Sequence, residues 1–248
     1  MKQRLRISRR RGVLLAGVAV LGLGGLAIAA YVAFRFSGLL VSDSNVAIRR
    51  WVDDPAARPA LRTLRLEGRC PGAPFILPSD GFVGLFWGDP APPYTLLNRH
   101  TGIDVFGEGT EGEVPVYAVY DGYLTRRSEW LSTVIIRHAD PLNPGQTIWT
   151  YYTHMASGDG QASYVAADFP RGTEGVWVEQ GTLLGYQGTY SGAAFPIALH
   201  VHLSIVRSDA EGNFLNEAVL DNTLDPSPYF GLNLRFEEAD GVPVGCQR

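Results

Sequence analysis

Cysteine is scarce in this chain of 248 residues, which contains only Cys70 and Cys246. Two cysteines so far apart lack the close pairing of cysteine-ligated zinc sites, so that class of site is excluded. They flank almost all of the chain beyond its N-terminal segment, and the two ends of a domain often lie close together. Because an even number of cysteines in an exported protein favours a disulfide, we predict one between them. Two free thiols are the alternative.

Basic residues are also few beyond the N-terminal segment. Residues 1–35 carry seven Lys and Arg and no acidic residue, whereas residues 36–248 carry 14 Lys and Arg against 25 Asp and Glu. Affinity for nucleic acid comes from Lys and Arg that neutralise phosphates, and the sequence has no basic stripe with interleaved aromatic residues. The composition therefore argues against nucleic acid as a partner.

A single long uncharged run stands near the N-terminus. Residues 12–34 are long enough to cross a bilayer as a helix, and they follow six basic residues within 1–11. Positive residues stay on the cytoplasmic side of a membrane. We therefore predict a basic cytoplasmic segment (1–11), a transmembrane anchor (12–34) and an extracytoplasmic remainder in a single-pass protein of the cell membrane. A cleavable signal peptide is the alternative, because Ala27-Ile28-Ala29 resembles a cleavage site.

Low-complexity segments and solenoid-type repeats are absent from the sequence. Residues 35–69 are expected to form a juxtamembrane connector that is partly helical and is interrupted by Pro55 and Pro59. In residues 70–248, short apolar runs such as STVIIRH, TIWTYYTHM and ALHVHLSIV alternate with Gly, Pro, Asn and Asp. This texture predicts a mainly β domain over residues 70–248. The long polar segment 156–175 is expected to be a loop that borders the functional groove, because it follows His154 directly.

The run ALHVHLSIV places two histidines in an otherwise apolar strand. Side chains of a strand point alternately to its two faces, so His200 and His202 share one face and their apolar neighbours occupy the other. A purely structural strand gains little from paired imidazoles, whereas a metal or catalytic site does gain from them. Two half-buried histidines bonded to backbone are the alternative.

A second pair of metal-ligand types stands in NRHTGIDVFG, where His100 precedes Asp104. Neutral imidazole and carboxylate both suit zinc. Gly102 disfavours a regular helix between them, so a loop has to turn both side chains inward. Taken alone, this spacing is equally typical of a surface turn with a capping Asp.

In combination, the motifs HTGID, YYTHM and LHVHLSI, separated by β-strands, resemble the lysostaphin-like zinc metallopeptidases of bacterial cell walls. VYAVYDGYL followed by VIIRH is similar to the strands before the family's middle histidine, and His138 at the end of VIIRH is expected to be structural. VEQGTLLGYQGTYSG and LDPSPYF are similar to its Gly-rich hairpin and its usual end. The resemblance covers roughly residues 75–230. It implies an antiparallel β-sheet peptidase domain with a substrate groove and a zinc cofactor.

The resemblance also implies roles for individual side chains. His100, Asp104 and His202 match the family's zinc ligands, and His154 and His200 match its catalytic histidines. Three protein ligands leave zinc an open position, which is the catalytic arrangement. The segment after His154 is longer than usual, AAFPIA replaces the usual Thr-Gly-Pro approach, and HVH replaces HLH. These departures remove no ligand, but they alter the groove walls.

We therefore expect a membrane-anchored zinc metalloendopeptidase that cleaves peptide bonds in peptidoglycan, either in stem peptides or in cross-bridges. Its expected partners are the wall peptide and the membrane. One alternative is a non-catalytic peptidoglycan-binding or regulatory module of the same fold that activates other wall hydrolases, but every ligand position is filled. Another is an HxH metal protein of a different fold, against which the YYTHM strand and the LDPSPYF ending count.

Overall fold

The computed structural model describes residues 24–26, 28–31, 43–193, 195–239 and 241–247. The chain divides into two compact units, Met1–Ser42 and Asp43–Arg248. The basic segment 1–11 and most of the anchor expected at 12–34 lie outside the described residues; residues 24–26 and 28–31 are helical. Within the described ranges, none of the helices has the length and apolar character needed to cross a membrane.

The second unit begins with the helical connector. Helix α2 (Asp43–Asp53) places an acidic residue in its first turn, which complements the positive end of the helix. It ends before Pro55, where the turn η1 (Pro55–Ala57) and the short helix α3 (Arg58–Leu61) follow. The residue before a proline avoids helical backbone, which accounts for the break.

These helices belong to the domain that follows them. Trp51 is buried and stacks on Phe82 with ring centroids 5.7 Å apart, and Ala57 and Leu61 join the same cluster with Phe106. The sequence had placed the start of the folded domain at residue 70. The compact unit that the structure describes begins at Asp43, because the connector buries its apolar face against the first two strands.

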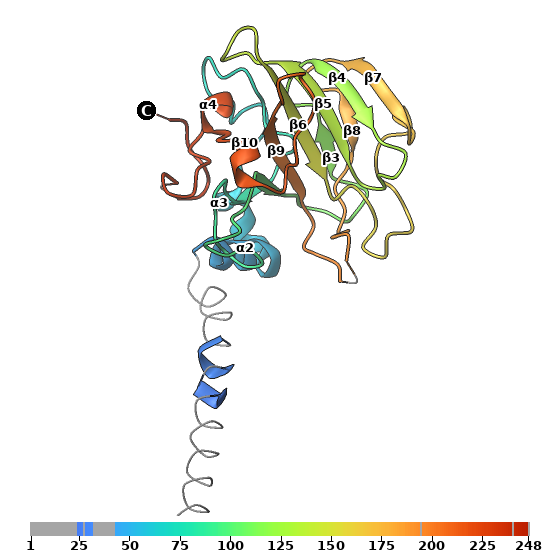
Figure 1. Ribbon diagram of the computed structural model, residues 1–248. Coiled ribbons are helices and arrows are strands. Elements are labelled where there is room, and N and C mark those ends of the chain that lie inside the picture. Colours follow the sequence, from blue (N-terminus) through green and yellow to red (C-terminus); the bar gives the residue numbers. More distant parts are fainter. Residues whose placement is uncertain (1–23, 27, 32–42, 194, 240, 248) are drawn as a thin grey trace, which may run out of the picture. The chain divides into compact units, whose positions relative to one another are not determined.

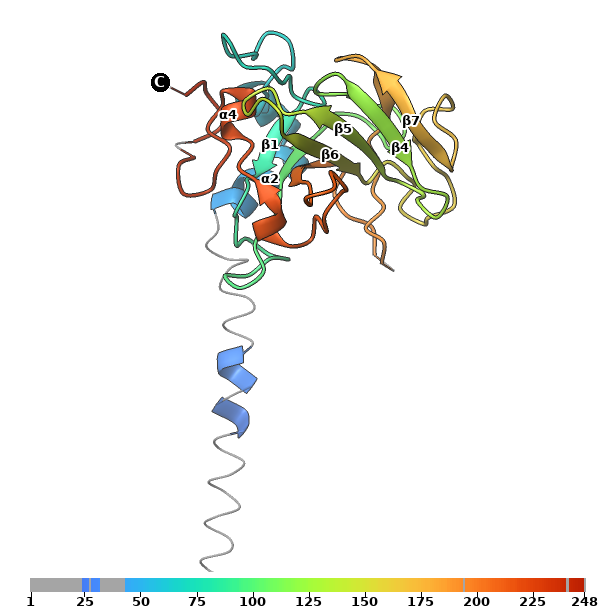
Figure 2. The same cartoon turned by 45° about the horizontal axis from the view of Figure 1, so that its top comes forward.

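One large antiparallel sheet dominates the domain (Figures 1 and 2). Its strands lie in the order β1-β2-β9-β6-β5-β4-β7, and β10 also pairs with β9. Their bounds are β1 Phe82–Leu85, β2 Ile103–Phe106, β9 Val201–Arg207, β6 Thr147–Thr153, β5 Val134–Ala139, β4 Gly122–Arg126, β7 Thr173–Val178 and β10 Thr223–Leu224. A second, two-stranded sheet pairs β3 (Pro115–Tyr117) with β8 (Leu183–Tyr186). The turn η2 (Leu220–Asn222) and helix α4 (Ser227–Phe230) are the other elements among the described residues of this unit. The expected mainly β, antiparallel fold is confirmed.

The two faces of the large sheet differ in character. On β6, Ile148, Thr150 and Tyr152 are buried, whereas Trp149, Tyr151 and the other alternate residues are half-buried. The buried face packs into the main apolar core. The opposite face, which we call the open face, is the one on which the register aligns Asp104 of β2, His202 of β9 and Thr153 of β6.

Cys70 and Cys246 form a disulfide, as predicted, with their Cα atoms 5.6 Å apart. Gly231 ends helix α4 with a φ of 65°, and a Cβ atom there would lie 2.8 Å from the Cβ of Cys70. Glycine is therefore required at this position both by the backbone conformation and by the closeness of the bridge. The bridge joins the beginning of the β-rich region to its end.

Candidate active site

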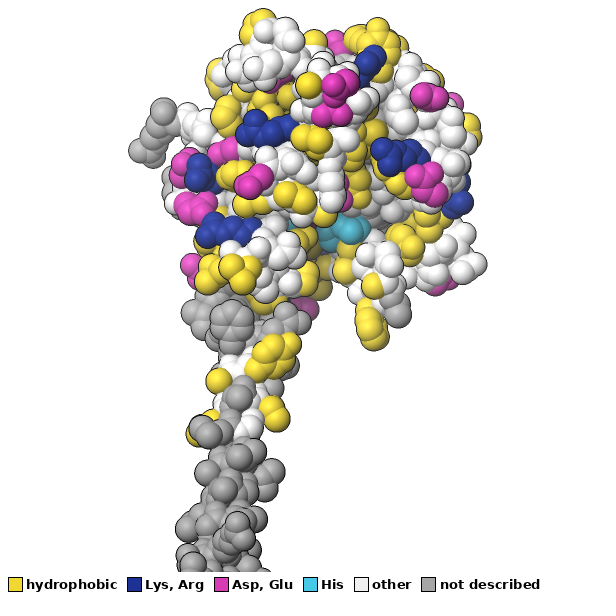
Figure 3. Space-filling view, viewed as in Figure 1, with side chains coloured by type: hydrophobic (Ala, Val, Ile, Leu, Met, Phe, Trp, Pro, Cys, Tyr) yellow, Lys and Arg dark blue, Asp and Glu magenta, His cyan; other side chains and the backbone are white. Residues whose placement is uncertain are grey.

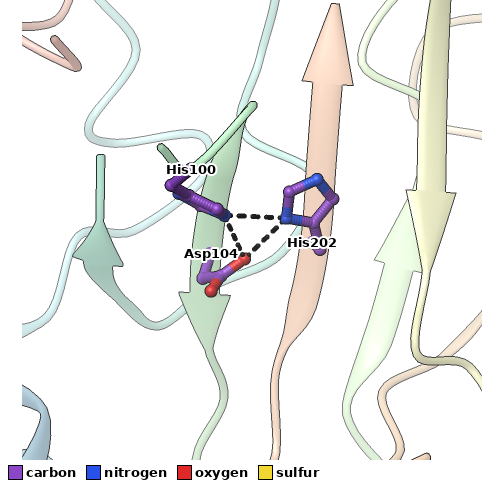
Figure 4. A group of neighbouring side chains, drawn as sticks. All are labelled: His100, Asp104 and His202. Atoms are coloured by element: carbon purple, nitrogen blue, oxygen red, sulfur yellow. Dashed lines mark hydrogen bonds and ion pairs between the residues drawn. The ribbon is translucent and has the colours of Figure 1, made fainter. Parts of the chain in front are cut away.

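His100, Asp104 and His202 converge on one point (Figure 4). Asp104 Oδ1 lies 2.9 Å from His202 Nδ1 and 3.1 Å from His100 Nε2, and the two nitrogens are 2.9 Å apart. Asp104 and His202 face each other because β2 and β9 pair in that register. All three residues are buried.

His100 reaches this point from the loop before β2. At Gly102 a Cβ atom would lie 2.1 Å from the carbonyl oxygen of Leu203, so only glycine lets this loop pass so close to β9. His100 Nδ1–H donates to the carbonyl oxygen of Phe86 at 3.0 Å, which fixes the orientation of the ring. In the HxxxD motif, His100 therefore lies in a loop and Asp104 lies in the strand that follows it.

The chemistry of these three side chains fits a metal cation. A carbonyl oxygen can only accept, so the proton of neutral His100 is on Nδ1 and a lone pair remains on Nε2. His202 Nε2 lies 2.8 Å from Ser204 Oγ and can donate a hydrogen bond to it. In that tautomer His202 keeps a lone pair on Nδ1. Two imidazole lone pairs and a carboxylate oxygen then face one another without a proton between them. A cation bound between them would remove the repulsion among these lone pairs, and this donor set suits zinc.

The Asp104 carboxylate dominates the electrostatics of the group. Burial by itself would raise the pKa of Asp104, but the facing imidazoles of His100 and His200 hold that pKa well below its usual range. Burial would lower the pKa of His100, but the Asp104 carboxylate raises it above its ordinary value. The carboxylate is therefore ionised in the site and attracts positive charge to it.

His154 and His200 form a second pair beside the first group. Their ring centroids are 4.6 Å apart, and His154 lies 6.2 Å from His202. Each uses Nδ1 to donate to a backbone carbonyl at 2.7 Å, that of Tyr190 for His154 and that of Ala198 for His200. Each ring is thereby left with a free lone pair on Nε2. The Nε2 atom of His200 lies 3.6 Å from Asp104 Oδ2.

Both of these histidines are neutral bases. Burial, reinforced by His200 and His202, lowers the pKa of His154 to about 3. Burial also lowers the pKa of His200, against the opposing pull of Asp104. His154 adopts a φ of 74°, in a region that residues other than glycine seldom occupy. Such backbone strain tends to occur at functional sites.

A cavity of about 480 Å³ adjoins this group and is lined by His154 and His202. In the face shown in Figure 3, histidine side chains are visible at the bottom of a recess. The open face of the sheet supplies its floor, with Tyr151, Thr153 and His202. Loops supply its walls, at residues 94–101, 129–133, 190–192 and 217–218.

The sequence predicted five side chains of this site but not several others that line the cavity. Tyr94 packs against His100 with ring centroids 4.8 Å apart, and Glu217 lines the same cavity. Trp130 also lines the cavity. None of these residues stands in a motif of metal ligands, and nothing local to them indicates that they meet. The long segment 156–175 contributes nothing to the lining of this cavity, although it follows His154.

His138 lies apart from the other histidines. Its Nδ1–H donates to the carbonyl oxygen of Asp121, and its Nε2 lies close to Thr150 Oγ1, both at 2.7 Å. Burial lowers the pKa of His138 to about 4. It faces the core side of β5, not the open face.

The comparisons with known proteins give distant matches. No protein-family model matches the chain, and no curated protein matches it. Among solved structures it is similar to the catalytic domain of the antimicrobial peptidase lysostaphin from Staphylococcus simulans, with 19% identity over 53% of this chain and 79% of that one and a TM-score of 0.35. It is also similar to whole lysostaphin, with 15% identity over 73% of this chain but only 58% of that one and a TM-score of 0.38.

A third similar structure is a variant of the catalytic domain of the prophage-encoded M23 protein EnpA from Enterococcus faecalis. The identity is 25% over 61% of this chain and 95% of that one, with a TM-score of 0.31. All three are lysostaphin-type or M23 peptidase domains. The superpositions are too distant to carry an argument about chemistry, so function has to be argued from the side chains described above.

Proposed function

We propose that this chain is a lysostaphin-like zinc metalloendopeptidase, anchored in the cell membrane, that cleaves peptide bonds in peptidoglycan stem peptides or cross-bridges. One observation carries the proposal. Three buried ligand atoms converge within 3.1 Å of one another, two neutral histidines stand beside them, and His154 and His202 line an adjoining cavity.

His100, Asp104 and His202 would hold the zinc ion. When bound, the ion supplies Lewis acidity and makes water more acidic. The protein contributes a fixed carboxylate and two imidazoles whose outer nitrogens are already engaged by Phe86 and Ser204. Such outer contacts orient metal ligands and set their protonation.

His154 and His200 would handle the protons. Each has a free Nε2 lone pair, so one of them can take the proton of the attacking water and return it to the departing amine. The other, when it carries a proton on Nε2, can donate that proton in a hydrogen bond to the oxygen on which negative charge develops. Because the two rings are 4.6 Å apart, a single scissile bond can lie within reach of both.

The membrane anchor and the location outside the cytoplasm are parts of the proposal that depend on the sequence. The uncharged segment 12–34 behind six basic residues supports an anchor with a cytoplasmic N-terminus. The disulfide supports a location outside the cytoplasm, where such bonds persist.

A digest of purified cell wall by the full chain tests the enzymatic part. New amino termini and shortened peptides, read by mass spectrometry, are expected with the wild-type chain and not with His200→Ala. A chain that binds the wall without releasing new termini would instead be the non-catalytic, regulatory module.

A further inference from the structure

A second cavity, of about 470 Å³, lies farther along the open face of the sheet. Its floor includes Thr125, Ile135 and Trp149. Thr125 pairs with Ile135, and Ile135 pairs with Tyr151 of the first cavity. Directly paired residues lie on the same face, and Glu129 lines both cavities. The two cavities are therefore consecutive sections of one trough, and the proposed zinc site lies in the first section.

Aromatic rings that line the two sections contact one another. Phe214 stacks on Tyr151 with centroids 6.2 Å apart and meets Trp149 edge-on at 5.9 Å. The indole N–H of Trp149 donates to Ser208 Oγ and to the carbonyl oxygen of Gly212, each at 3.2 Å. The orientation of Trp149 is thus fixed and its only donor is used. What these residues offer to a ligand is ring surface.

Polar side chains of both signs line the rest of the second section. Arg127 stacks over Trp130 at 4.8 Å, and Glu129 and Glu174 are exposed. The remaining polar lining consists of Thr125, Arg126, Ser128, Thr173 and Asn213. This mixture does not select for a ligand of one charge. It offers hydrogen bonds at the edges of an aromatic surface.

The floor of the trough is a sheet face, so its backbone N–H and C=O groups are already used by the strand ladder. A peptide therefore cannot add itself there as another strand, and recognition falls to side chains. A pyranose ring has C–H groups on its faces and hydroxyl or amide groups around its rim. That pattern is complementary to aromatic rings with polar neighbours.

We propose that the second section of the trough is a saccharide subsite that holds the glycan part of a wall substrate while the first section holds the peptide. This inference rests on the proposed function, because it assigns a second part of the same substrate. The surface also continues beyond the cavity. Tyr123 and Trp177 are exposed, lie 5.0 Å apart and share the open face through the pairing of Tyr123 with Arg137 and of Arg137 with Trp149.

A binding experiment on the full chain tests the subsite directly. Calorimetric titration with chitotetraose, the tetramer of N-acetylglucosamine, should detect binding. Phe214→Leu keeps an apolar side chain without its ring and should weaken binding about 10-fold, whereas Phe214→Tyr should preserve it. The matched control is Phe236→Leu, which changes a phenylalanine in a different cavity and should leave affinity unchanged. Circular dichroism establishes that each variant is folded.

A kinetic experiment separates this inference from the proposed function. Phe214→Leu should raise KM about 10-fold, at constant kcat, on cross-linked wall fragments that retain their sugars. It should not change either constant on the same peptides after hydrolysis of the sugar–peptide bond. An equal effect on both substrates, or a wild-type chain that does not bind chitotetraose, overturns the saccharide subsite. A wild-type chain that binds chitotetraose but cleaves neither substrate overturns the peptidase proposal and leaves the subsite supported.

Discussion

His154 and His200 lie with their ring centroids 4.6 Å apart, and each is held by the same kind of bond, an Nδ1–H donated to a backbone carbonyl at 2.7 Å. One residue follows strand β6 and the other precedes β9, so the pairing of these two strands brings the rings together. Neither histidine belongs to the set of three atoms that converge on a metal position. We therefore propose that the five histidine and aspartate side chains of the site divide into zinc ligands and proton carriers.

This division predicts two kinds of variant. Replacing His100, Asp104 or His202 with Ala should remove zinc and also lower stability, because metal binding couples to folding. Replacing His154 or His200 with Ala should leave zinc bound but lower turnover by roughly 100-fold or more. Zinc content per chain, measured beside the cleavage rate, distinguishes the two kinds. Loss of zinc in His200→Ala together with its retention in His202→Ala would reverse the assignment.

His138 predicts a dependence of stability on pH. Its pKa in the folded chain is lowered to about 4, below the ordinary value of about 6.5. The unfolded chain therefore binds the proton more readily, so this contribution is complete above pH 6.5 and is lost as the pH falls toward 4. Its size is at most about 3 kcal/mol. Urea unfolding should show that His138→Gln makes the free energy of unfolding depend less steeply on pH in this window. Arg137 is an exposed neighbour, and Arg137→Gln should leave that dependence unchanged.

The disulfide predicts a large effect of reduction. Because the bond closes a loop with a sequence separation of 176, it removes chain entropy from the unfolded state. The double variant Cys70→Ser with Cys246→Ser should lose up to about 5 kcal/mol in the free energy of unfolding. Denaturation with and without reductant measures this loss. Two thiols that react with a labelling reagent in the unreduced, denatured chain would show that no bridge forms.

Trp51 predicts that the connector is part of the folded domain. It is 2% exposed, stacks on Phe82 and donates its indole N–H to the carbonyl oxygen of Gly107 at 3.2 Å. Trp51→Ala should lower the free energy of unfolding by about 3–5 kcal/mol. Its neighbour Val52 is 45% exposed, and Val52→Ala should change stability by no more than about 0.5 kcal/mol. Equal melting temperatures for the two variants would mean that the helices do not contribute to the domain's stability.

The N-terminal segment predicts firm attachment to the membrane. Full-length protein should stay with the membrane fraction after a wash in alkaline carbonate, because residues 12–34 are long enough to span it. Immunoblotting of pellet and supernatant measures this. Release of a mature chain that begins near Ala30 would support a cleaved signal peptide.

The sequence predicted the parts of the site that depend on local spacing. The two-residue period of a strand places His200 and His202 on one side, and His202 indeed lies beside Asp104. It could not predict contacts made by the tertiary fold. Trp130 and Glu217 reach the cavity from loops that are far apart in the chain, and Trp51 belongs to the domain through contacts with strands that come later. Residues 173–175, expected in a loop, begin strand β7 because β4 offers them a partner.

The contrast between the two faces of the sheet limits where this chain can gain or lose residues during evolution. One residue inserted within β6 would turn Tyr152 toward the open face and Tyr151 toward the core, and would separate Thr153 from His202. In the loops that form the cavity walls, side chains do not alternate between the core and the open face. Insertions and deletions are therefore expected in the loops and excluded from the strands. Descendants of this chain could change the substrate that they accept while the histidines and Asp104 stay in place.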